Sequence, residues 1–450
     1  MGEAASQSFS KAAKQSWGDR NRIGVSIRIA HSLASALLLS GSLYLPATAA
    51  DLTTAPAATG YNWNGFYVGV GGGIGAIVHE VEVPPFGGFE FNGIGGEGYF
   101  GELTVGYDMQ LTERIVAGVF ATYRAGNIAT TLDVDFGPIN FDADVTLDHG
   151  YDIIGRLGYL VTPNTLAYVL GGYSHQHFAL DTNIGFDMDW DADGYVLGGG
   201  LETVLTGNWT LKSEYRYGQY DLGNFGLGSF LDVDSSTHTF HAALAYRFGG
   251  GATATAASFA PVNYDFAGLK VGIAGGLGAV VHELDIFNGI ANFNGIGGEG
   301  AFGEVSIGYD FRIAPNWIAG VQADYRWGAI STDLDLPAAP FDASITADHG
   351  YDVIARLGYE VYDNTLVYGL AGLSWQHFQL DTSVGGIDYD WDTHGWTAGA
   401  GIEAALSDRI TAKVEYRYAE YDGEDFESGG ILEAISSTHT VRFGLSYKIF

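Results

Sequence analysis

The sequence predicts an all-β fold of two tandem antiparallel barrels, and three observations support this prediction. First, segments recur at an offset between 200 and 203 residues, as in Asn92–Gly98 and Asn294–Gly300. Second, apolar and polar residues alternate through segments of about 10 residues, as in β-strands with one apolar face. Third, the chain contains 67 glycines and 14% aromatic residues but only 16% charged residues. This composition suits a sheet with a crowded interior and disfavours a helical protein.

We expect eight strands in each copy, an even number that suits an up-and-down barrel. In the first copy they lie near 65–76, 98–110, 114–127, 150–161, 165–180, 190–206, 209–220 and 237–248. In the second copy they lie near 268–279, 300–312, 316–328, 350–361, 365–380, 391–407, 410–421 and 438–449. Short turns such as 111–113, 162–164 and 207–208 alternate with long loops such as 77–97, 128–149 and 221–236. Short turns on one side and long loops on the other are typical of barrels in outer membranes.

The alternation also predicts which face of each strand points outward. One face of 99–109 carries Tyr99, Leu103, Val105, Tyr107 and Met109, and one face of 209–217 carries Trp209, Leu211, Tyr215 and Tyr217. These faces end in aromatic residues, as expected where a barrel meets the two membrane interfaces. A soluble barrel with the apolar face inside is the alternative. The strand at 165–180 does not alternate cleanly, so its faces are left unassigned.

The opposite, charged face is balanced in sign, which predicts a narrow lumen filled by ion pairs. The first copy carries five acids and five bases: Glu102, Asp108, Asp152, Glu202, Glu214, Arg124, Arg156, Lys212, Arg216 and Arg247. The second copy carries Glu304, Asp310, Asp352, Glu403, Glu415, Arg326, Arg356, Lys413, Arg417 and Lys448. An eight-stranded barrel has room for little besides its own side chains.

Residues 1–50 have the features of a signal peptide. A basic run, from Lys11 to Arg28, precedes an apolar stretch from Leu33 to Leu45 and the small residues Ala47–Ala50. We expect cleavage after Ala49 or Ala50 and export through the inner membrane. No later segment approaches the ~20 apolar residues of a membrane-spanning helix. The absence of cysteine excludes disulfides and thiolate sites, and a net charge of −33 argues against nucleic acid as a partner.

Several motifs resemble a known family. Trp63–Val70, Asp148–Asp152 with Arg156–Tyr159, and Ala245–Phe248 are similar to the Omp25/Omp31-type, porin-family outer-membrane β-barrels of alpha-proteobacteria, here in tandem duplication. The resemblance implies a Gram-negative cell outer membrane, with its lipid and lipopolysaccharide as partners. It also implies recognition by the outer-membrane insertion machinery through a terminal aromatic residue. Phe248 fits that signal, whereas Ile449 aligns with it in the second copy and Phe450 is one extra residue.

We therefore expect four segments. Residues 1–50 are a signal peptide with an extended n-region, 61–248 the first barrel, 249–263 a flexible linker rich in Gly and Ala, and 264–450 the second barrel. The alternative is one 16-stranded barrel, which would enclose an aqueous channel. That alternative needs a hairpin turn of about 15 residues at the linker, longer than usual.

Chemistry-bearing residues are few, and we predict no catalytic, cofactor-binding or metal-binding residue and no enzyme activity. Histidines recur at four matched places: His79 and His282, His149 and His349, His177 and His377, and His238 and His439. The resemblance implies paired histidines as hemin ligands, whereas simple hydrogen bonding is the interpretation we favour. The acidic segments Asp187–Asp193 and Asp388–Asp392 are calcium candidates, but they lack the spacing of an EF-hand loop, and a solvated acidic rim is the interpretation we favour.

The expected function is an envelope-structural and surface-interaction role in the outer membrane, with plugged lumens. The alternatives are a porin-like passive channel for small solutes, or surface binding of hemin or cations. The acidic excess falls mainly in the expected long loops, where it would attract cations: Asp133, Asp135, Asp142, Asp144, Asp181, Asp187, Asp221, Asp232 and Asp234.

Overall fold

The structure is a computed structural model. It describes residues 60–84, 89–135, 140–223, 232–253, 259, 262–286, 291–336, 341–362, 364–383, 389–425 and 432–450. The predicted signal peptide and parts of the linker lie outside these ranges. No helix in the described ranges is long and apolar enough to cross a membrane.

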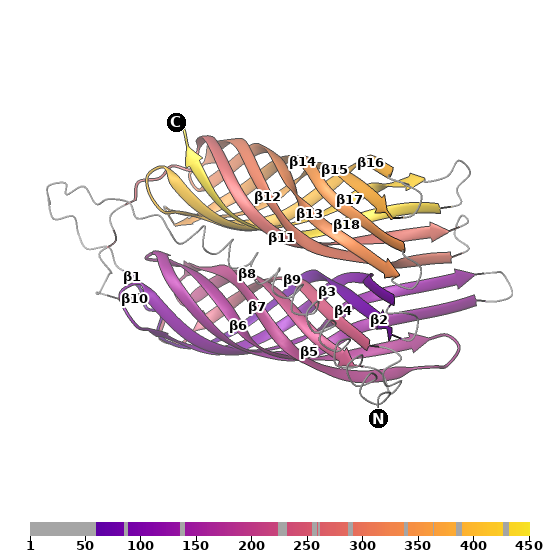
Figure 1. The fold of residues 1–450 in the computed structure, drawn as a ribbon. Coiled ribbons are helices and arrows are strands. Elements are labelled where there is room, and N and C mark those ends of the chain that lie inside the picture. Colours follow the sequence, from indigo (N-terminus) through magenta and orange to yellow (C-terminus); the bar gives the residue numbers. More distant parts are fainter. Residues whose placement is uncertain are drawn as a thin grey trace, which may run out of the picture. The chain divides into compact units, whose positions relative to one another are not determined.

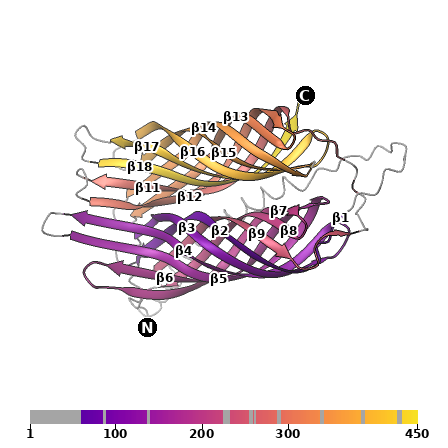
Figure 2. The same cartoon turned by 180° about the vertical axis from the view of Figure 1, so that it is seen from behind.

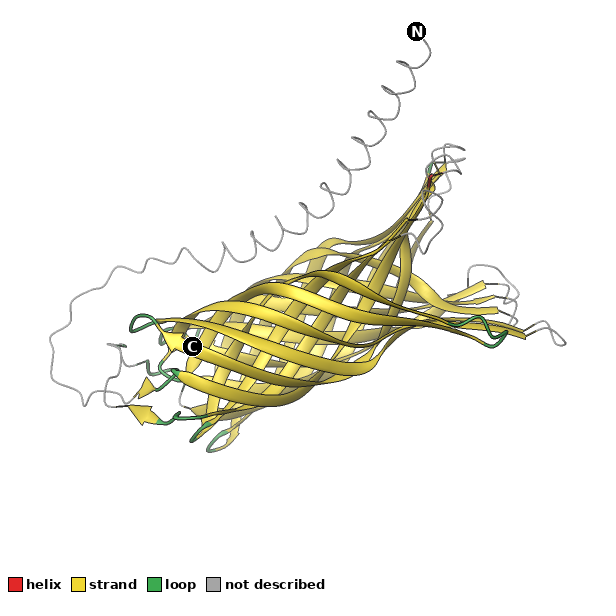
Figure 3. Cartoon of the chain, turned by 90° about the horizontal axis from the view of Figure 1, so that it is seen from below, coloured by secondary structure: helices red, strands yellow, loops and turns green. Residues whose placement is uncertain are grey.

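Antiparallel strands account for nearly all of the described residues, as predicted (Figure 3). The first repeat, defined here as β2 to β9, comprises β2 (Gly65–Val83), β3 (Phe89–Gln110), β4 (Ile115–Asp135), β5 (Asn140–Thr162), β6 (Thr165–Thr182), β7 (Met188–Thr206), β8 (Trp209–Gly223) and β9 (Asp232–Arg247). The second repeat, β11 to β18, comprises β11 (Gly268–Ile286), β12 (Ala291–Ala314), β13 (Trp317–Leu336), β14 (Phe341–Tyr362), β15 (Thr365–Thr382), β16 (Tyr389–Ala405), β17 (Ile410–Asp425) and β18 (Leu432–Lys448). All sixteen expected strands are therefore present.

The eight strands of each repeat pair in sequence order and close into a ring (Figures 1 and 2). Closure of the first ring runs from Tyr67↔Arg247 to Glu82↔Asp232 between β2 and β9. Closure of the second runs from Lys270↔Lys448 to Ile286↔Leu432 between β11 and β18. Two short strands, β1 (Gly60–Tyr61) and β10 (Ala252–Thr253), pair outside both rings, so part of the expected linker is ordered.

Short cross-pairings also join the repeats. β12 pairs with β4 from Ala291↔Val134 to Asn294↔Thr131, and β13 pairs with β3 from Asp333↔Asn92 to Asp335↔Glu90. If the strand order is traced through these cross-pairings, all sixteen strands form one larger ring. The pairing pattern alone is therefore compatible with two rings of eight and with one ring of sixteen.

The expected long loops are largely strand, which corrects the sequence interpretation. Ile77–Val83 belongs to β2 and Phe89–Glu97 to β3, so that the expected loop at 77–97 shrinks to a hairpin tip. The expected loops at 128–149 and 221–236 shorten in the same way. The segments were expected as loops because they are rich in Gly, Asn and Asp, which are common in loops. The hydrogen bonds between adjacent strands nevertheless continue far past the apolar band, so these segments are strand. The acidic residues expected on loops therefore lie mostly on strand extensions.

The expected outward faces are exposed in the first strands of each repeat. Tyr99, Leu103 and Val105 are 70%, 61% and 54% exposed, which confirms that the apolar face points away from the ring. Tyr215 and Tyr217 were also expected on the outward face, but both are buried. The reason is that this side of β8 and β9 packs against the second repeat, where Phe240 stacks on Tyr416 with ring centroids 4.7 Å apart.

The contact between the repeats is reciprocal. Glu299 accepts hydrogen bonds from Ser236 and His238 of the first repeat, the latter at 2.8 Å. At the aligned positions, Glu97 accepts hydrogen bonds from Ser437 and His439 of the second repeat, also at 2.8 Å for the histidine. Each repeat therefore presents the same patch to the other, the arrangement of a two-fold interface.

Candidate functional site

The face of each strand that points into its ring carries charged side chains, and they are buried. In the first repeat all ten of the predicted residues have at most 4% of their surface exposed. Burying an ionised group is costly unless an opposite charge and hydrogen bonds surround it. The contacts of these side chains therefore decide what the interior can do.

One cluster of ion pairs in the first repeat lies near the short turns. Arg156 donates to Asp108 at 2.9 Å and to Glu202 at 2.7 Å. Arg247 contacts the same two carboxylates, at 2.6 Å for Asp108 and 3.0 Å for Glu202. Two guanidinium groups thus share two carboxylates, which neutralises the charge within the cluster.

A second cluster lies further along the interior. Arg216 pairs with Glu214 and with Asp152, the latter at 3.0 Å, and Glu102 lies 3.4 Å away. Tyr168 donates to the other oxygen of Glu214 at 2.6 Å. Strands from all parts of the ring contribute to this cluster, so the side chains reach across the whole interior.

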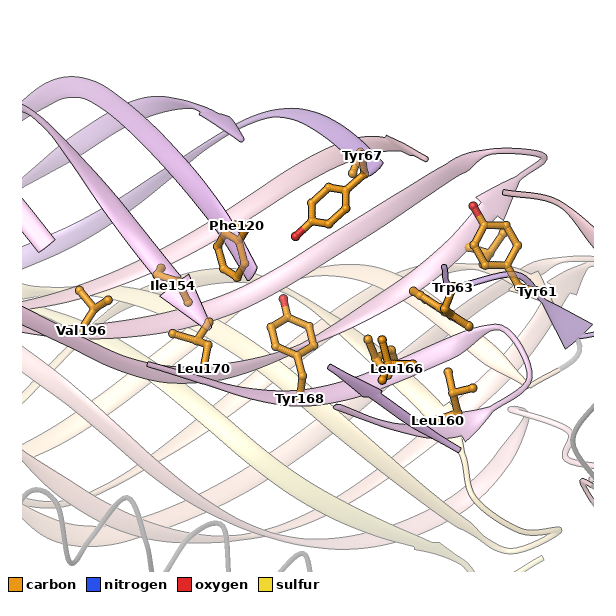
Figure 4. Close-up of a cluster of buried hydrophobic side chains, with 13 residues drawn as sticks. Tyr61, Trp63, Tyr67, Phe120, Ile154, Leu160, Leu166, Tyr168, Leu170 and Val196 are labelled. Carbon is orange, nitrogen blue, oxygen red and sulfur yellow. The ribbon is translucent and has the colours of Figure 1, made fainter. Parts of the chain in front are cut away.

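Apolar side chains close the interior on both sides of the ion pairs. Near the short turns, Tyr61 and Trp63 precede β2 and pack with Tyr67, Leu160 and Leu166 (Figure 4). The guanidinium of Arg247 lies 5.1 Å from the Trp63 ring centroid, so this plug covers the ion pairs directly. At the far side lies a second buried cluster: Ile77, Phe100, Ile128, Leu147, Phe178, Ala192, Tyr220, Leu222 and Val233.

The second repeat has the same layers with different residues. Tyr264 and Phe266 form its plug near the short turns, in a cluster with Ile318, Ile354 and Leu366. Arg356 pairs with Asp310 and Glu403, as Arg156 does with its two carboxylates. Its far cluster contains Val280, Phe302, Ile330, Ala347, Phe378, Trp391, Ala419 and Tyr421.

All ten expected charges of the second repeat lie on the inward face, but the partly exposed Lys448 does not pair with the buried carboxylates as expected. That ammonium donates to the backbone oxygen of Asp265 instead of to the buried carboxylates. Lys270, at the position of Tyr67, takes the inner role and lies 2.9 Å from Asp310 and 3.2 Å from Glu403. Alternation along 268–279 places Lys270 on the inward face. The aligned position in the first repeat holds the uncharged Tyr67, so Lys270 was not among the expected charges.

Two further inward charges of the second repeat escaped the sequence analysis. Arg442, at the position of His241, donates to Glu304 at 2.6 Å. Asp324, at the position of Thr122, accepts from Arg417 at 2.7 Å. Each is buried, and together they add one positive and one negative charge to the interior.

The four matched histidine pairs fall into three environments. His79 and His282 are buried beside Ser235 and Ser436, and His238 and His439 lie in the contact between repeats. His149 and His177 come together on the outer face of β5 and β6, with ring centroids 4.5 Å apart. His349 and His377 do the same in the second repeat at 4.6 Å. Hemin binding by these pairs stays a prediction.

The acidic segments at the loop side engage these outer histidines. Asp191 accepts a hydrogen bond from His177 at 2.8 Å, and Asp193 accepts one from His175 at 2.7 Å. The hydrogen bond raises the pKa of His177 and lowers the pKa of Asp191. In the second repeat Asp392 accepts from His377 at 2.9 Å, whereas Asp388 lies outside the described residues.

Negative charge also gathers on the strand extensions of β4, β5 and β6. Partial burial, followed by the charges of Asp133, Asp142 and Asp181, raises the pKa of Asp144. Mutually repelling carboxylates create a negative potential that attracts cations to this end of the first repeat.

Comparisons with known proteins agree with this architecture. The family model described as outer membrane protein beta-barrel domain matches residues 45–248 and again residues 250–448. The 31 kDa outer-membrane immunogenic protein of Brucella melitensis biotype 1 is 28% identical over 218 residues, covering 44% of this chain and 88% of that protein. The 25 kDa outer-membrane immunogenic protein of Brucella abortus biovar 1 is 34% identical over 134 residues, covering 29% and 58% respectively.

A third relative is the 22 kDa outer membrane protein of Rhizobium leguminosarum bv. viciae. It is 30% identical over 165 residues, which cover 34% of this chain and 75% of that protein. Each of these three relatives covers less than half of this chain, as expected for a domain that occurs twice here.

Proposed function

Because this chain belongs to the family of outer-membrane β-barrel proteins, in a duplicated form, we propose that it serves an envelope-structural role as two separate eight-stranded barrels with closed lumens. The observation that carries the proposal is the buried, charge-balanced interior of each repeat. Its ion pairs, such as those of Arg156 with Asp108 and Glu202, reach across the ring between strands β3, β5 and β7. A pore needs water along its axis, whereas these charged groups satisfy one another.

The apolar clusters support closure at both ends. Water entering from the short-turn side of the first repeat would have to pass Trp63, which is fully buried. From the other side it would meet Phe100, Phe178 and Tyr220. An interior this full is what an eight-stranded barrel provides, since its diameter leaves space only for side chains.

A porin-like channel is the second candidate, favoured by the cross-pairings through which a single ring of sixteen strands can be traced. Opening that ring would require β3 to leave β4 along a ladder that runs from Glu97↔Ala129 to Gln110↔Val116. β12 would also have to leave β13 along a ladder from Glu299↔Ser331 to Ala314↔Trp317. The short cross-pairings replace few of those hydrogen bonds, so we favour two closed barrels.

The outer wall supports a membrane-embedded role with lipid and lipopolysaccharide as partners. Leu103 and Val105 lie on the exposed face of β3, between Tyr107, which pairs with Phe66, on one side and Tyr99 on the other. An exposed apolar band flanked by aromatic residues matches the hydrocarbon layer and its two interfaces. Beyond this band the acidic strand extensions face the aqueous side, where they serve as the surface-interaction region of the proposal.

Single-channel conductance of the purified protein in a planar bilayer tests the proposal. Closed barrels give no steps, even when heat-modifiable gel migration shows that the protein is folded and protease protection shows that it is inserted. Stable steps on the nanosiemens scale would overturn the closed lumens and favour one 16-stranded pore. A known porin inserted under the same conditions is the positive control.

A further inference from the structure

The outward-facing histidines of β5 and β6 have no part in the proposed structural role. His149 and His177 are direct cross-strand partners in the β5–β6 ladder, and His349 and His377 are partners in the β14–β15 ladder. They lie on the loop side of Tyr151 and Tyr173, past the aromatic edge of the apolar band. Both imidazoles in each pair are partly exposed, so ions in solution reach them.

The hydrogen bonds of each pair fix the orientation of the rings. Nδ1 of His149 lies 2.7 Å from Asp148, and Nδ1 of His177 lies 2.8 Å from Asp191. For His177, whose partner is Asp191, a carboxylate that accepts from Nδ1–H leaves the lone pair on Nε2, the form in which histidine ligates a metal. His149 instead directs Nδ1 at Asp148, so a metal ion bound between these two groups takes the place of the proton that they share. No described residue forms a hydrogen bond to Nε2 of either His149 or His177.

A third donor is brought to the pair by an irregularity in the strand. The β5–β6 register shifts between Leu147 and His149, which leaves Asp148 as an extra residue outside the ladder. Bulges of this kind re-aim a side chain and are frequent beside functional sites. One donor atom from each of Asp148, His149 and His177 falls within 4.8 Å of the other two.

The second repeat reproduces each of these features. The β14–β15 register shifts between Ala347 and His349, and the donor atoms of Asp348, His349 and His377 again lie within 4.8 Å of one another. Asp348 and Asp392 accept from the two Nδ1 atoms, each at 2.9 Å. The neighbouring residues differ, since His175 corresponds to Trp375 and Asp193 to His394. The two histidines and the aspartate are therefore the same in both repeats, although the residues beside them differ.

We infer that each repeat carries a surface site for a divalent transition metal ion, formed by His149, His177 and Asp148 in the first repeat and by His349, His377 and Asp348 in the second. Two imidazole nitrogens and one carboxylate oxygen form a donor set that suits Zn²⁺, with water as the fourth ligand. Ca²⁺ and Mg²⁺ prefer all-oxygen sites and fit it poorly.

Binding requires a small rearrangement of exposed side chains. Metal–ligand bonds of about 2.0–2.1 Å in a tetrahedron place neighbouring ligand atoms roughly 3.3 Å apart. The donor atoms lie within 4.8 Å of one another, so a pair at that limit must close by about 1.5 Å. The outer carboxylates Asp191 and Asp392 can keep their hydrogen bonds during this movement, as carboxylates behind metal-binding histidines do.

Zinc titration calorimetry on the purified protein in detergent micelles tests the inference. Calcium is kept in large excess to occupy the acidic strand extensions. The unmodified protein takes up two equivalents of Zn²⁺ per chain, His177→Gln takes up one, and His177→Gln combined with His377→Gln takes up none. Heat-modifiable gel migration verifies that each variant is folded.

His394→Gln is the matched control, because His394 is an exposed histidine with one carboxylate partner, Asp422, at 3.0 Å and no second imidazole. It retains both equivalents. Cobalt provides an independent readout, since a tetrahedral site with nitrogen and oxygen ligands gives visible absorption that the double variant lacks. Two equivalents retained by the double variant, or no saturable binding by the unmodified protein, would overturn the inference. Neither result bears on whether the lumens are closed.

Discussion

The interiors of the two repeats differ at a few charged positions, and these differences compensate for one another. The first repeat has Tyr67 and Arg247 where the second has Lys270 and Lys448 on the closing strands. In the first, Arg247 contacts Asp108 and Glu202, while in the second, Lys270 contacts the matching carboxylates from the opposite strand. A positive charge is thus kept at the same place in space although it moves between strands.

A second difference between the repeats also preserves the charge balance of the interior. Replacing His241 by Arg442 adds a buried cation, and replacing Thr122 by Asp324 adds a buried anion. An uncompensated buried charge is strongly destabilising, so either change alone would be costly. The interior therefore tolerates substitution as long as its charge stays balanced.

The largest effect is expected for the residue that both repeats share. Arg156→Met leaves Asp108 and Glu202 with only Arg247, and Arg356→Met leaves Asp310 and Glu403 with only Lys270. Each change should lower the free energy of unfolding by about 3–5 kcal/mol, the range for breaking a buried ion pair. Urea titration of the protein folded in lipid vesicles measures it. Arg409→Met, at an exposed arginine, is the control and should leave the midpoint almost unchanged.

The aligned residues on the closing strands should respond unequally. Arg247→Met removes a buried partner of two carboxylates and should cost about 2–4 kcal/mol, somewhat less than the loss of Arg156 because that arginine remains. Lys448→Met should cost little, whereas Lys270→Met should behave like Arg247→Met. The same urea titration compares all three. Equal losses for Lys448→Met and Lys270→Met would contradict the exchange of roles between the strands.

A double-mutant cycle probes the compensating pair of the second repeat. Arg442→His removes the cation beside Glu304 and leaves Asp324 as excess negative charge, at an expected cost of about 1–3 kcal/mol. Adding Asp324→Thr reproduces the arrangement of the first repeat and should restore most of that loss. The interaction free energy between the two sites is the measured quantity. Additive losses would show that charge balance does not couple them.

The smallest effect is expected at the contact between repeats. Glu97→Gln and Glu299→Gln each weaken hydrogen bonds to a serine and a histidine of the other repeat, at about 1 kcal/mol. Glu299 should show the larger loss, because its side chain is 8% exposed and that of Glu97 is 28% exposed. Thermal unfolding followed by gel migration ranks the two variants. The reverse order would mean that burial does not set the strength of this contact.

Much of the fold could be predicted because strand periodicity is a local property. Alternation around Tyr107 and Asp108 identified both the outward and the inward face, and the short turns marked the strand ends on one side. Hairpin length was not predictable in the same way. Segments such as Ile128–Asp135 are rich in polar residues, and only pairing with β5 shows that they are strand.

The candidate sites also differ in whether local sequence patterns or strand pairing determine them. The inward charges near Arg156 follow from alternation, so nearly all of them were found. The pairing of His149 with His177 depends on the register and on the shift that releases Asp148, and register is set by hydrogen bonds between segments far apart in sequence. The plugs at Trp63 and Phe266 were missed because they precede the first strand and follow no strand pattern.

By itself, the sequence determined that the chain is a duplicated, all-β outer-membrane protein with an apolar outer face and a charged inner face. The duplication, the strands and the two faces follow from composition, internal repetition and period-two alternation, which need no knowledge of contacts. The outer-membrane assignment also follows from the resemblance of motifs such as Trp63–Val70 to a known family. Only the tertiary structure decided that Tyr215 lies between the repeats, that Lys270 replaces Arg247, and that two histidines and an aspartate meet on the outer surface. Each of those results depends on which strands are neighbours and in what register, because side chains distant in sequence interact only after the ladders have formed.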